Sequence, residues 1–171
     1  SGTTLKLPLG SLALENISTA VAAILLSGLT VSQAAIAQGI QQAKLQGRFE
    51  IRQIQDKTVI FDVGHNPHGV NFLLQQLRKY LEYNKQYTEV ISVFSMLADK
   101  DINSVVELLK DTVLTWKIAP LTVPRAAERA QLDAALQGET VQHFESVQLA
   151  FKSALNETKN NQLILVCGSF H

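Results

Sequence analysis

The chain has 171 residues, enough for one medium-sized domain with a piece of another attached. Hydrophobic residues make up 46% and charged residues 18%, a composition that can bury a core and excludes a disordered chain. Fifteen basic and fifteen acidic residues balance each other, and no basic tract occurs, so nothing in the composition supports nucleic-acid binding.

The single cysteine, Cys167, follows the apolar run 163–166, where a buried structural thiol is expected rather than a reactive one. No secretory signal is recognised. The longest apolar stretch, around Ala20 to Leu26, is too short to span a bilayer. We therefore expect a cytoplasmic, reducing compartment and no membrane partner.

Two helices are predicted in the first 46 residues, where apolar side chains recur at a spacing of three to four. Gly28 should end the first helix, and either Thr30 or Ser32 can cap the second. The apolar positions are Ile17, Ala20, Val21, Ile24 and Leu25, then Ala35, Ile36 and Ile40. These helices are either the end of a preceding domain or a hairpin packed on the sheet that follows, because a helix pair needs a neighbour for its apolar face.

From about residue 49 the pattern predicts an α/β domain. Strands 49–54 and 58–61 should pair antiparallel, because no crossover helix fits between them. Further strands are predicted at 89–94, 114–119, 139–143 and 162–167, alternating with helices at 68–83, 102–111, 128–136 and 145–157. This alternation indicates a mostly parallel, six-stranded Rossmann-like sheet that is covered on both faces and has one antiparallel edge strand.

A polar turn, residues 62–69, follows strand 58–61 and precedes a helix, at the carboxyl edge of the sheet where ligands bind in α/β folds. Asp62 can accept hydrogen bonds from a ribose diol, and His65 can donate one to a phosphate, better when it is protonated. Asn66 can cap the helix, with Pro67 at its first position. These residues can also be purely structural, but their crowding favours a ligand site.

Four further residues support weaker hypotheses. Arg48 lies between the helical part and the sheet, where it can reach a phosphate or be a solvated linker charge. Asn16, at the start of the first helix, is most simply a helix cap. Lys100 and Arg125 follow strands and can meet an anionic ligand or face solvent.

Several common motifs do not occur. The sequence has no G-x-x-x-x-G-K-[ST] phosphate loop and no G-x-G-x-x-G turn. No G-x-S-x-G elbow occurs either. His65 and His68 have no evident third ligand, so no metal site is assigned. At most, this chain supplies one wall of a nucleotide site.

The turn Asp62-x-x-His65-Asn66-Pro67 resembles the signature of folylpolyglutamate synthases, which belong to the Mur ligase superfamily. Three more segments are similar, in the same order, and together they cover essentially the whole chain: Gly47-Arg48-Phe49-Glu50, Met96 through Asp101, and Val166 through His171. The loop from Ala119 to Arg125 also fits the bifunctional form of the family, dihydrofolate synthase/folylpolyglutamate synthase.

The resemblance implies that residues 1–46 are the last helices of a central ATPase domain and that residues 47–171 are the C-terminal domain, truncated at its end. It implies an ATP-dependent ligase that adds L-glutamate to dihydropteroate and to folyl (poly)glutamates through an acyl phosphate. The phosphate loop and the Mg²⁺ ligands would lie upstream, and the fragment alone would be inactive.

Residue by residue, the resemblance assigns Asn16 to the adenine and Arg48 to the ATP phosphates. It assigns Asp62 and His65 to holding ATP from the C-terminal domain. No catalytic residue and no metal ligand is assigned, and no role is given to His68, Lys100, Arg125 or His171. Two alternatives stay open: another amino acid ligase of the superfamily, and a non-catalytic nucleotide-binding module.

Overall fold

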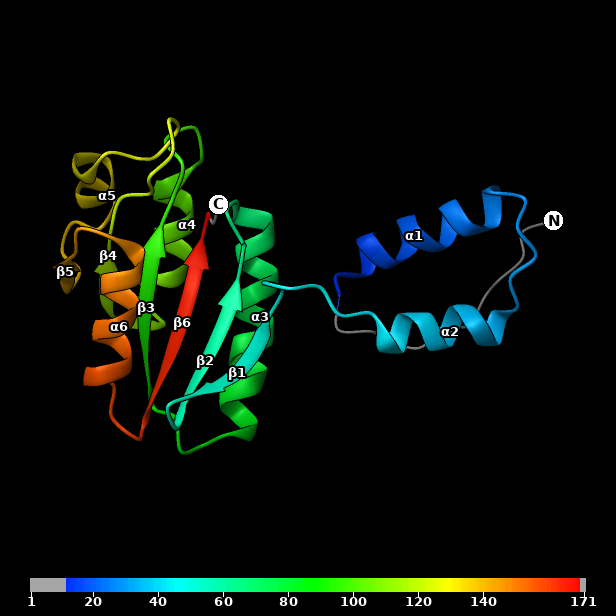
Figure 1. Ribbon diagram of the computed structural model, residues 1–171, viewed down its shortest axis with the longest axis horizontal. Helices are drawn as coiled ribbons and strands as arrows, with labels where there is room; N and C mark the ends of the chain where they lie inside the picture. Colours follow the sequence, from blue (N-terminus) through cyan, green and yellow to red (C-terminus); the bar gives the residue numbers. More distant parts are fainter. Residues whose placement is uncertain (1–11, 170–171) are drawn as a thin grey trace. The chain divides into compact units, whose positions relative to one another are not determined.

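The computed structural model describes residues 12–169 and divides the chain into two compact units, one ending at Gln46 and the other beginning at Gly47 (Figure 1). The first unit pairs helix α1 (Leu14–Leu26) with helix α2 (Gln33–Gln42). Its core is formed by Ile17, Val21, Ile36 and Ile40. Ser32 caps α2 by accepting the N–H of Ala35 at 3.2 Å, so Ser32, and not Thr30, is the N-cap.

Much apolar surface of this first unit lies outside that core. The exposed large side chains described there are Leu14, Leu25, Leu26, Leu29, Val31 and Leu45. Across residues 12–169, no helix combines the length and the apolar character that crossing a membrane requires.

The second unit is built on a sheet with the spatial order β1-β2-β6-β3-β4-β5. Its strands are β1 (Glu50–Ile54), β2 (Lys57–Asp62), β3 (Glu89–Ser95), β4 (Val113–Ile118), β5 (Val141–His143) and β6 (Gln162–Gly168). Among these six strands, only the edge pair β1–β2 is antiparallel, and its two-residue turn places Gln55 and Asp56 at positive φ. The predicted fold class is confirmed.

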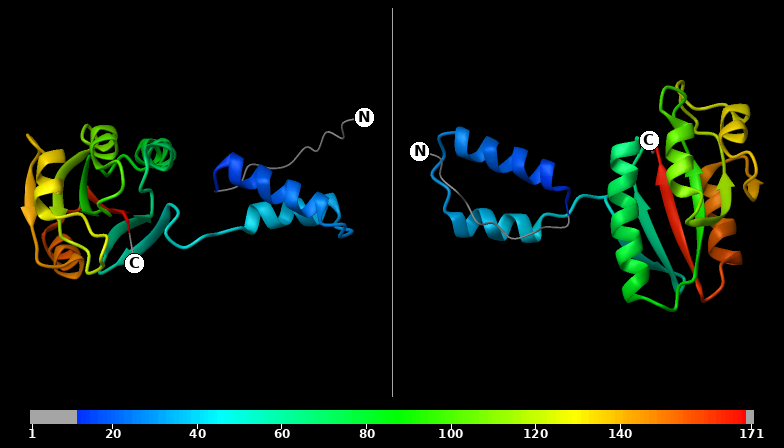
Figure 2. Two further views of the ribbon diagram at one scale, coloured as in Figure 1. Left: turned by 90° about the horizontal axis from the view of Figure 1, so that it is seen from above. Right: turned by 180° about the vertical axis from the view of Figure 1, so that it is seen from behind.

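Helices cover both faces of this sheet (Figure 2). Helices α3 (Pro67–Tyr83), α4 (Ile102–Leu109) and α5 (Arg129–Ala135) pack on one face, and α6 (Val147–Glu157) packs on the other. Because side chains alternate along a strand, Leu163 and Leu165 of β6 join the first core, whereas Ile164 and Val166 join the second.

The last strand, β6, lies in the middle of the sheet, between β2 and β3. Its register therefore brings three strand ends together: Asp62 is opposite Cys167, and Ser95 is opposite Gly168. Cys167 is fully buried, as expected, and burial raises the pKa of its thiol to about 12. This shared carboxyl edge carries the polar turn that the sequence singled out.

Candidate functional site

Asp62 ends β2 and is buried at the carboxyl edge, with 4% of its surface exposed. Its Oδ2 accepts the backbone N–H of Phe49 at 2.8 Å, and its Oδ1 accepts that of Gly64 at 2.7 Å. Both carboxylate oxygens are thus engaged by the main chain, one by the segment before β1 and one by the turn after β2. A ribose hydroxyl would have to reach an acid that is already buried and bonded.

Burial raises the pKa of the Asp62 carboxyl above its ordinary value of 3.8. The hydrogen bonds from Phe49 and Gly64 and the nearby charge of Arg48 act in the opposite direction, but they do not outweigh burial. A buried acid with a perturbed pKa beside an arginine is typical of a functional site, although structural networks produce the same signature.

His65 is half-buried in the turn after Asp62, and its Nδ1 lies 2.9 Å from the backbone oxygen of Val63. Because a carbonyl oxygen can only accept, Nδ1 must carry the hydrogen. The other ring nitrogen, Nε2, is then an acceptor in the neutral ring and a donor only in the protonated one. The expected hydrogen bond from His65 to a phosphate therefore requires the imidazolium form.

The turn leads directly into the N-terminus of α3. Asn66 caps this helix by accepting the N–H of Gly69 at 2.8 Å, and Pro67 occupies the first helical position, as predicted. Partial positive charge from the aligned peptide dipoles collects at such an end and favours anions. His68 is exposed on the first turn.

Arg48 is exposed, and within residues 12–169 its guanidinium forms no salt bridge or hydrogen bond. It belongs to the second unit and lies close enough to Asp62 to influence its ionisation. Its side chain therefore remains available to an anion at the edge where β2 ends.

Asn16 belongs to the first unit, where it is exposed on α1. The suggestion that it caps this helix is wrong, because α1 begins earlier, at Leu14, with Ala13 as its N-cap and no side-chain cap bond. The N–H of Asn16 instead bonds the oxygen of Ala13 at 3.0 Å. The helix start therefore leaves the amide side chain of Asn16 without a capping role.

Sequence reasoning gave no role to Ser95 or Gly168, which help to build the edge beside Asp62. Gly168 has φ 114°, and a Cβ there would lie 2.0 Å from the oxygen of Ser95. The N–H of Ser169 bonds the same oxygen at 2.9 Å, and the Ser169 hydroxyl accepts the N–H of Leu97 at 3.4 Å. A glycine directly after an apolar strand was the available signal.

The loops beyond β3 and β4 are joined by an ion pair. Arg125 pairs with Asp99, and Lys100 lies 3.9 Å from the same carboxylate. The hydrogen bond from Arg125 is the main cause that lowers the pKa of Asp99. Arg125 is therefore not a free cation. The remaining edge residues, Phe170 and His171, lie outside the described part of the chain.

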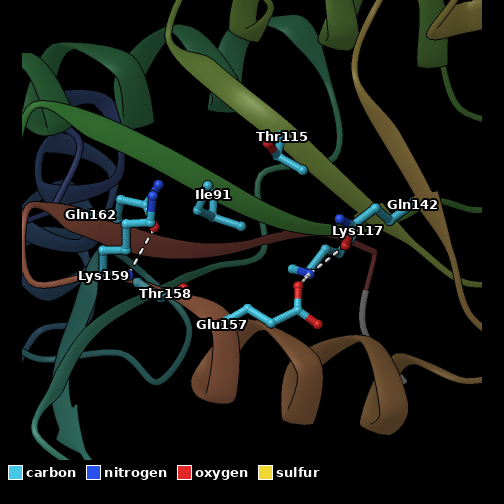
Figure 3. Close-up of a pocket in the computed structure, with 8 residues that line it drawn as sticks. All are labelled: Ile91, Thr115, Lys117, Gln142, Glu157, Thr158, Lys159 and Gln162. Carbon is cyan, nitrogen blue, oxygen red and sulfur yellow. Dashed lines mark hydrogen bonds and ion pairs between the residues drawn. The ribbon is translucent and has the colours of Figure 1, made fainter.

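A second polar cluster lies around Lys117 of β4, on the face that α6 covers (Figure 3). The side chain of Lys117 is 3% exposed, and its ammonium donates to Gln142, to Ser153 at 2.9 Å and to Glu157 at 2.7 Å. A hollow of about 140 Å³ borders it, lined by the eight residues that Figure 3 labels, and it reaches Gln162 at the start of β6. All three donors of the lysine are satisfied, so this cluster ties α6 to the sheet.

Residues 47–170 match the family described as Mur ligase, glutamate ligase domain. The dihydrofolate synthase/folylpolyglutamate synthase of Escherichia coli (strain K12) is 43% identical over 171 residues, which are 99% of this chain and 39% of that protein. The protein of the same name from Haemophilus influenzae is 28% identical, over 97% of this chain and 42% of its own length.

The similar solved structures are of proteins of the same kind. E. coli FolC in complex with DHPP and ADP has a TM-score of 0.83 at 40% identity, covering 99% of this chain and 39% of that one. The bifunctional folylpolyglutamate synthase/dihydrofolate synthase of Yersinia pestis, complexed with AMPPNP and Mn ion, has a TM-score of 0.81 at 36% identity, covering 98% and 39%. The chain thus spans about two fifths of the length of the relatives that it matches.

Proposed function

Because the chain belongs to the Mur ligase family through its glutamate ligase domain, we propose that it is the C-terminal portion of an ATP-dependent amide ligase. The proposed reaction adds L-glutamate to dihydropteroate and to folyl (poly)glutamates. Its main support is the 43% identity to a dihydrofolate synthase/folylpolyglutamate synthase across 99% of this chain. The site of action would be the cytoplasm, where these small molecules are used.

The nucleotide would be held in part by Asn16, Arg48, Asp62 and His65. An unpaired guanidinium, a histidine and a helix N-terminus meet at the carboxyl edge of the sheet, a combination suited to phosphate groups. Relatives were solved with ADP, or with AMPPNP and Mn ion, which supports ATP and a divalent metal as cofactors. The role of Asn16 in contacting the adenine rests on the family resemblance alone.

The remaining parts of the site would come from the rest of the protein. Among residues 12–169 no group of three or more His, Cys, Asp or Glu side chains is arranged to hold a metal ion. We assign the Mg²⁺ ligands to the part of the relatives that this chain does not span. The exposed apolar side chains of the first unit, among them Leu25 and Leu26 of α1, would pack on the remainder of the ATPase domain.

The proposed chemistry has two steps. The substrate carboxylate attacks the γ-phosphate of ATP, forming an acyl phosphate and releasing ADP; the glutamate amine then attacks the acyl carbon, and phosphate leaves. Such phosphoryl transfer depends on positioning and on neutralisation of charge. Arg48 would neutralise phosphate charge, and protonated His65 would donate to it through Nε2. Closure of this domain over the site would exclude water from the acyl phosphate.

The test uses the full-length ligase with Arg48→Ala. Loss of one charged hydrogen bond to phosphate should lower ATP-dependent ligation at least ~10-fold. Arg129→Ala is the matched control, since Arg129 is exposed on α5 and its nearest acidic partner is Asp133. Activity of the Arg48 variant within about twofold of wild type would remove Arg48 from the site.

Calorimetric titration of the 171-residue chain with Mg-ATP provides a separate test. We expect no micromolar binding, because this sequence has no phosphate-loop motif and residues 12–169 hold no cluster of side chains arranged to bind a metal ion. Micromolar affinity would instead identify the chain as a nucleotide-binding module that works without the rest of a ligase.

A further inference from the structure

The hollow beside Lys117 lies away from the polar turn. It reaches Gln162 at the amino end of β6, whereas the polar turn lies beside the carboxyl end of that strand, where β2 ends at Asp62. Between its two ends β6 extends over about 20 Å. Figure 3 shows Lys117 and Glu157 toward one end of the hollow, and Lys159 and Gln162 toward the other. A ligand in the hollow would therefore not touch the polar turn.

At the Lys117 end, two side-chain donors hold one carboxylate. Oε2 of Glu157 accepts from the Lys117 ammonium at 2.7 Å, and Oε1 accepts from the Ser153 hydroxyl at 2.6 Å. Lys117 also donates to Ser153 at 2.9 Å, so the spacing of the two donors is set without Glu157. The ammonium and the hydroxyl thus form a fixed cradle for the two oxygens of a carboxylate.

The carboxylate in this cradle is the exchangeable part. Glu157 is the last residue of α6, and its side chain is 57% exposed, so its ion pair contributes little to stability. The side chain of Lys117 is only 3% exposed. Its ammonium is also held by Gln142, by Ser153 and by the ring of Phe144, whose centroid lies 5.4 Å from Nζ. The cation would therefore stay in place if Glu157 turned into solvent.

Stability alone does not explain a lysine at this position. Val93, which is opposite Lys117 in the neighbouring strand, belongs to the apolar core under α6, together with Ala150 and Ile164. Buried ion pairs can often be replaced by apolar side chains without loss of stability. An aliphatic residue would therefore suit this face, whereas a lysine supplies a fixed cation beside a hollow.

The size and charge of the hollow define what it can hold. Its volume is about 140 Å³, and an engineered cavity of about 150 Å³ takes up a six-carbon ring, so a small organic acid fits. Lys159 brings a second positive charge at the other end. Glu157 is the single acid among the lining residues described, and Glu89 is bound by the amide of Gln162 without lining the hollow. With Glu157 turned away, the lining would carry two positive charges.

We propose that this hollow is a binding site for a small dicarboxylate. One carboxylate takes the place of Glu157 on Lys117 and Ser153, and the other meets Lys159. Thr158 lines the hollow between the two ends, and within residues 12–169 its buried hydroxyl has no hydrogen-bond partner. An unpaired buried hydroxyl is costly, so a ligand oxygen that accepts from it is favoured. The proposal does not depend on the proposed function, because it uses none of the residues assigned to the nucleotide.

The first test is an NMR titration of the 171-residue chain with glutarate at constant ionic strength. Amide signals of Gln142, Thr158 and Lys159 should shift and saturate with a Kd of about 1–10 mM, while those of Gly64 and Gly69 in the polar turn stay unchanged. Acetate, which lacks the second carboxylate, should bind at least ~3-fold more weakly.

Three results of this titration would overturn the proposal. The first is the lack of a saturable shift around the hollow up to about 50 mM glutarate. The second is acetate binding as tightly as glutarate, which would mean that the second carboxylate has no partner. The third is inorganic phosphate binding at least as tightly as glutarate, which would make the hollow a general anion site.

The second test removes the cation. Lys117→Met keeps the aliphatic stem and deletes the ammonium, so glutarate should bind at least ~10-fold more weakly. Lys110→Met is the matched control, because Lys110 also forms an ion pair, with Glu107 at 2.6 Å, but does not line the hollow. Unchanged glutarate affinity in Lys117→Met would show that the buried ammonium is not part of a site.

The third test removes the competing carboxylate and does not depend on the folding of Lys117→Met. Glu157→Gln keeps the shape of the side chain but not its charge, so a ligand carboxylate has less to displace and should bind about two- to fivefold tighter. Glu82→Gln, which removes an acid of α3, should leave the affinity unchanged. Equal or weaker glutarate binding in Glu157→Gln would contradict the exchange of carboxylates on which the proposal rests.

Discussion

Residues 12–46 and residues 47–169 are both built from amphipathic elements, but they bury their apolar side chains to different extents. The sheet of the second unit has a core on each face, and its largest buried side chains include Trp116, Phe94 and Leu73. The first unit has a core of four buried residues and leaves six large apolar side chains exposed, three of them on α1 and three outside its two helices. A helix pair of this size gains too little burial to offset the entropy of folding by itself.

The units also differ in whether they contain buried polar groups. All the buried polar or charged side chains described, including Asp62 and Lys117, belong to the second unit. A large core can offset the cost of burying such groups, and a four-residue core cannot. The buried polar groups are therefore concentrated in the unit that has the larger core.

Shortening one buried side chain in each unit should have the largest effect, and it tests whether the two units unfold separately. Leu73→Ala removes a fully buried side chain of α3 and should lower the free energy of unfolding of the second unit by about 3 kcal/mol. The fluorescence of Trp116, the single tryptophan, reports on that unit during denaturant unfolding. Ile36→Ala in α2 is the matched truncation, and a shift of the Trp116 transition by that variant would show that the units unfold together.

Two glycines with positive φ offer a similar pair. Gly168→Ala would place a Cβ 2.0 Å from the Ser95 oxygen, so unfolding of the second unit should become easier by about 2–3 kcal/mol. Gly28→Ala, where no atom lies within 4 Å of the new Cβ, should leave the Trp116 transition unchanged. Equal effects of both variants on this transition would remove the structural reason for a glycine at 168.

The stability of the second unit should depend on pH through the ionisation of Asp62, which is buried in that unit. Burial raises the pKa of this acid above 3.8, so the folded chain binds its proton more tightly than the unfolded chain. The contribution of Asp62 to stability is therefore greatest at low pH and falls as the pH rises from 3.8 through the folded pKa. Asp62→Asn should remove this fall from Trp116 unfolding curves, and an unchanged pH dependence would contradict the assigned shift.

The smallest effect is expected at the cluster that ties α6 to the sheet. The hydrogen bond from Lys117 is the main cause that lowers the pKa of Glu157 below 4.5, so its stabilisation is present above that pH and is lost as the pH falls through the folded pKa. The Glu157 side chain is 57% exposed, so Glu157→Gln should cost only ~0.5 kcal/mol at neutral pH. Glu82→Gln, near the end of α3, is the control and should cost less.

The sequence by itself determined the features that depend on neighbouring residues. Helix and strand positions, the antiparallel hairpin and the cap at Asn66 follow from periodicity and from turn chemistry within a few positions. The polar turn after β2 could be found in the same way, because its residues are consecutive. The prediction that Asn16 caps α1 was wrong even though a helix cap is a local feature. The helix begins at Leu14, about one turn before the start that a cap at Asn16 would give.

Only the tertiary structure decided which distant segments meet. The last strand lies between β2 and β3, Lys117 is buried against Glu157, and Asp62 holds Phe49 thirteen positions before it. None of these follows from composition or spacing, because strand order and side-chain partners are set by how all the elements pack at once. The sequence could thus indicate Asp62 as a polar residue at a sheet edge, and the fold shows that its carboxylate is already engaged by the backbone around Arg48 and His65.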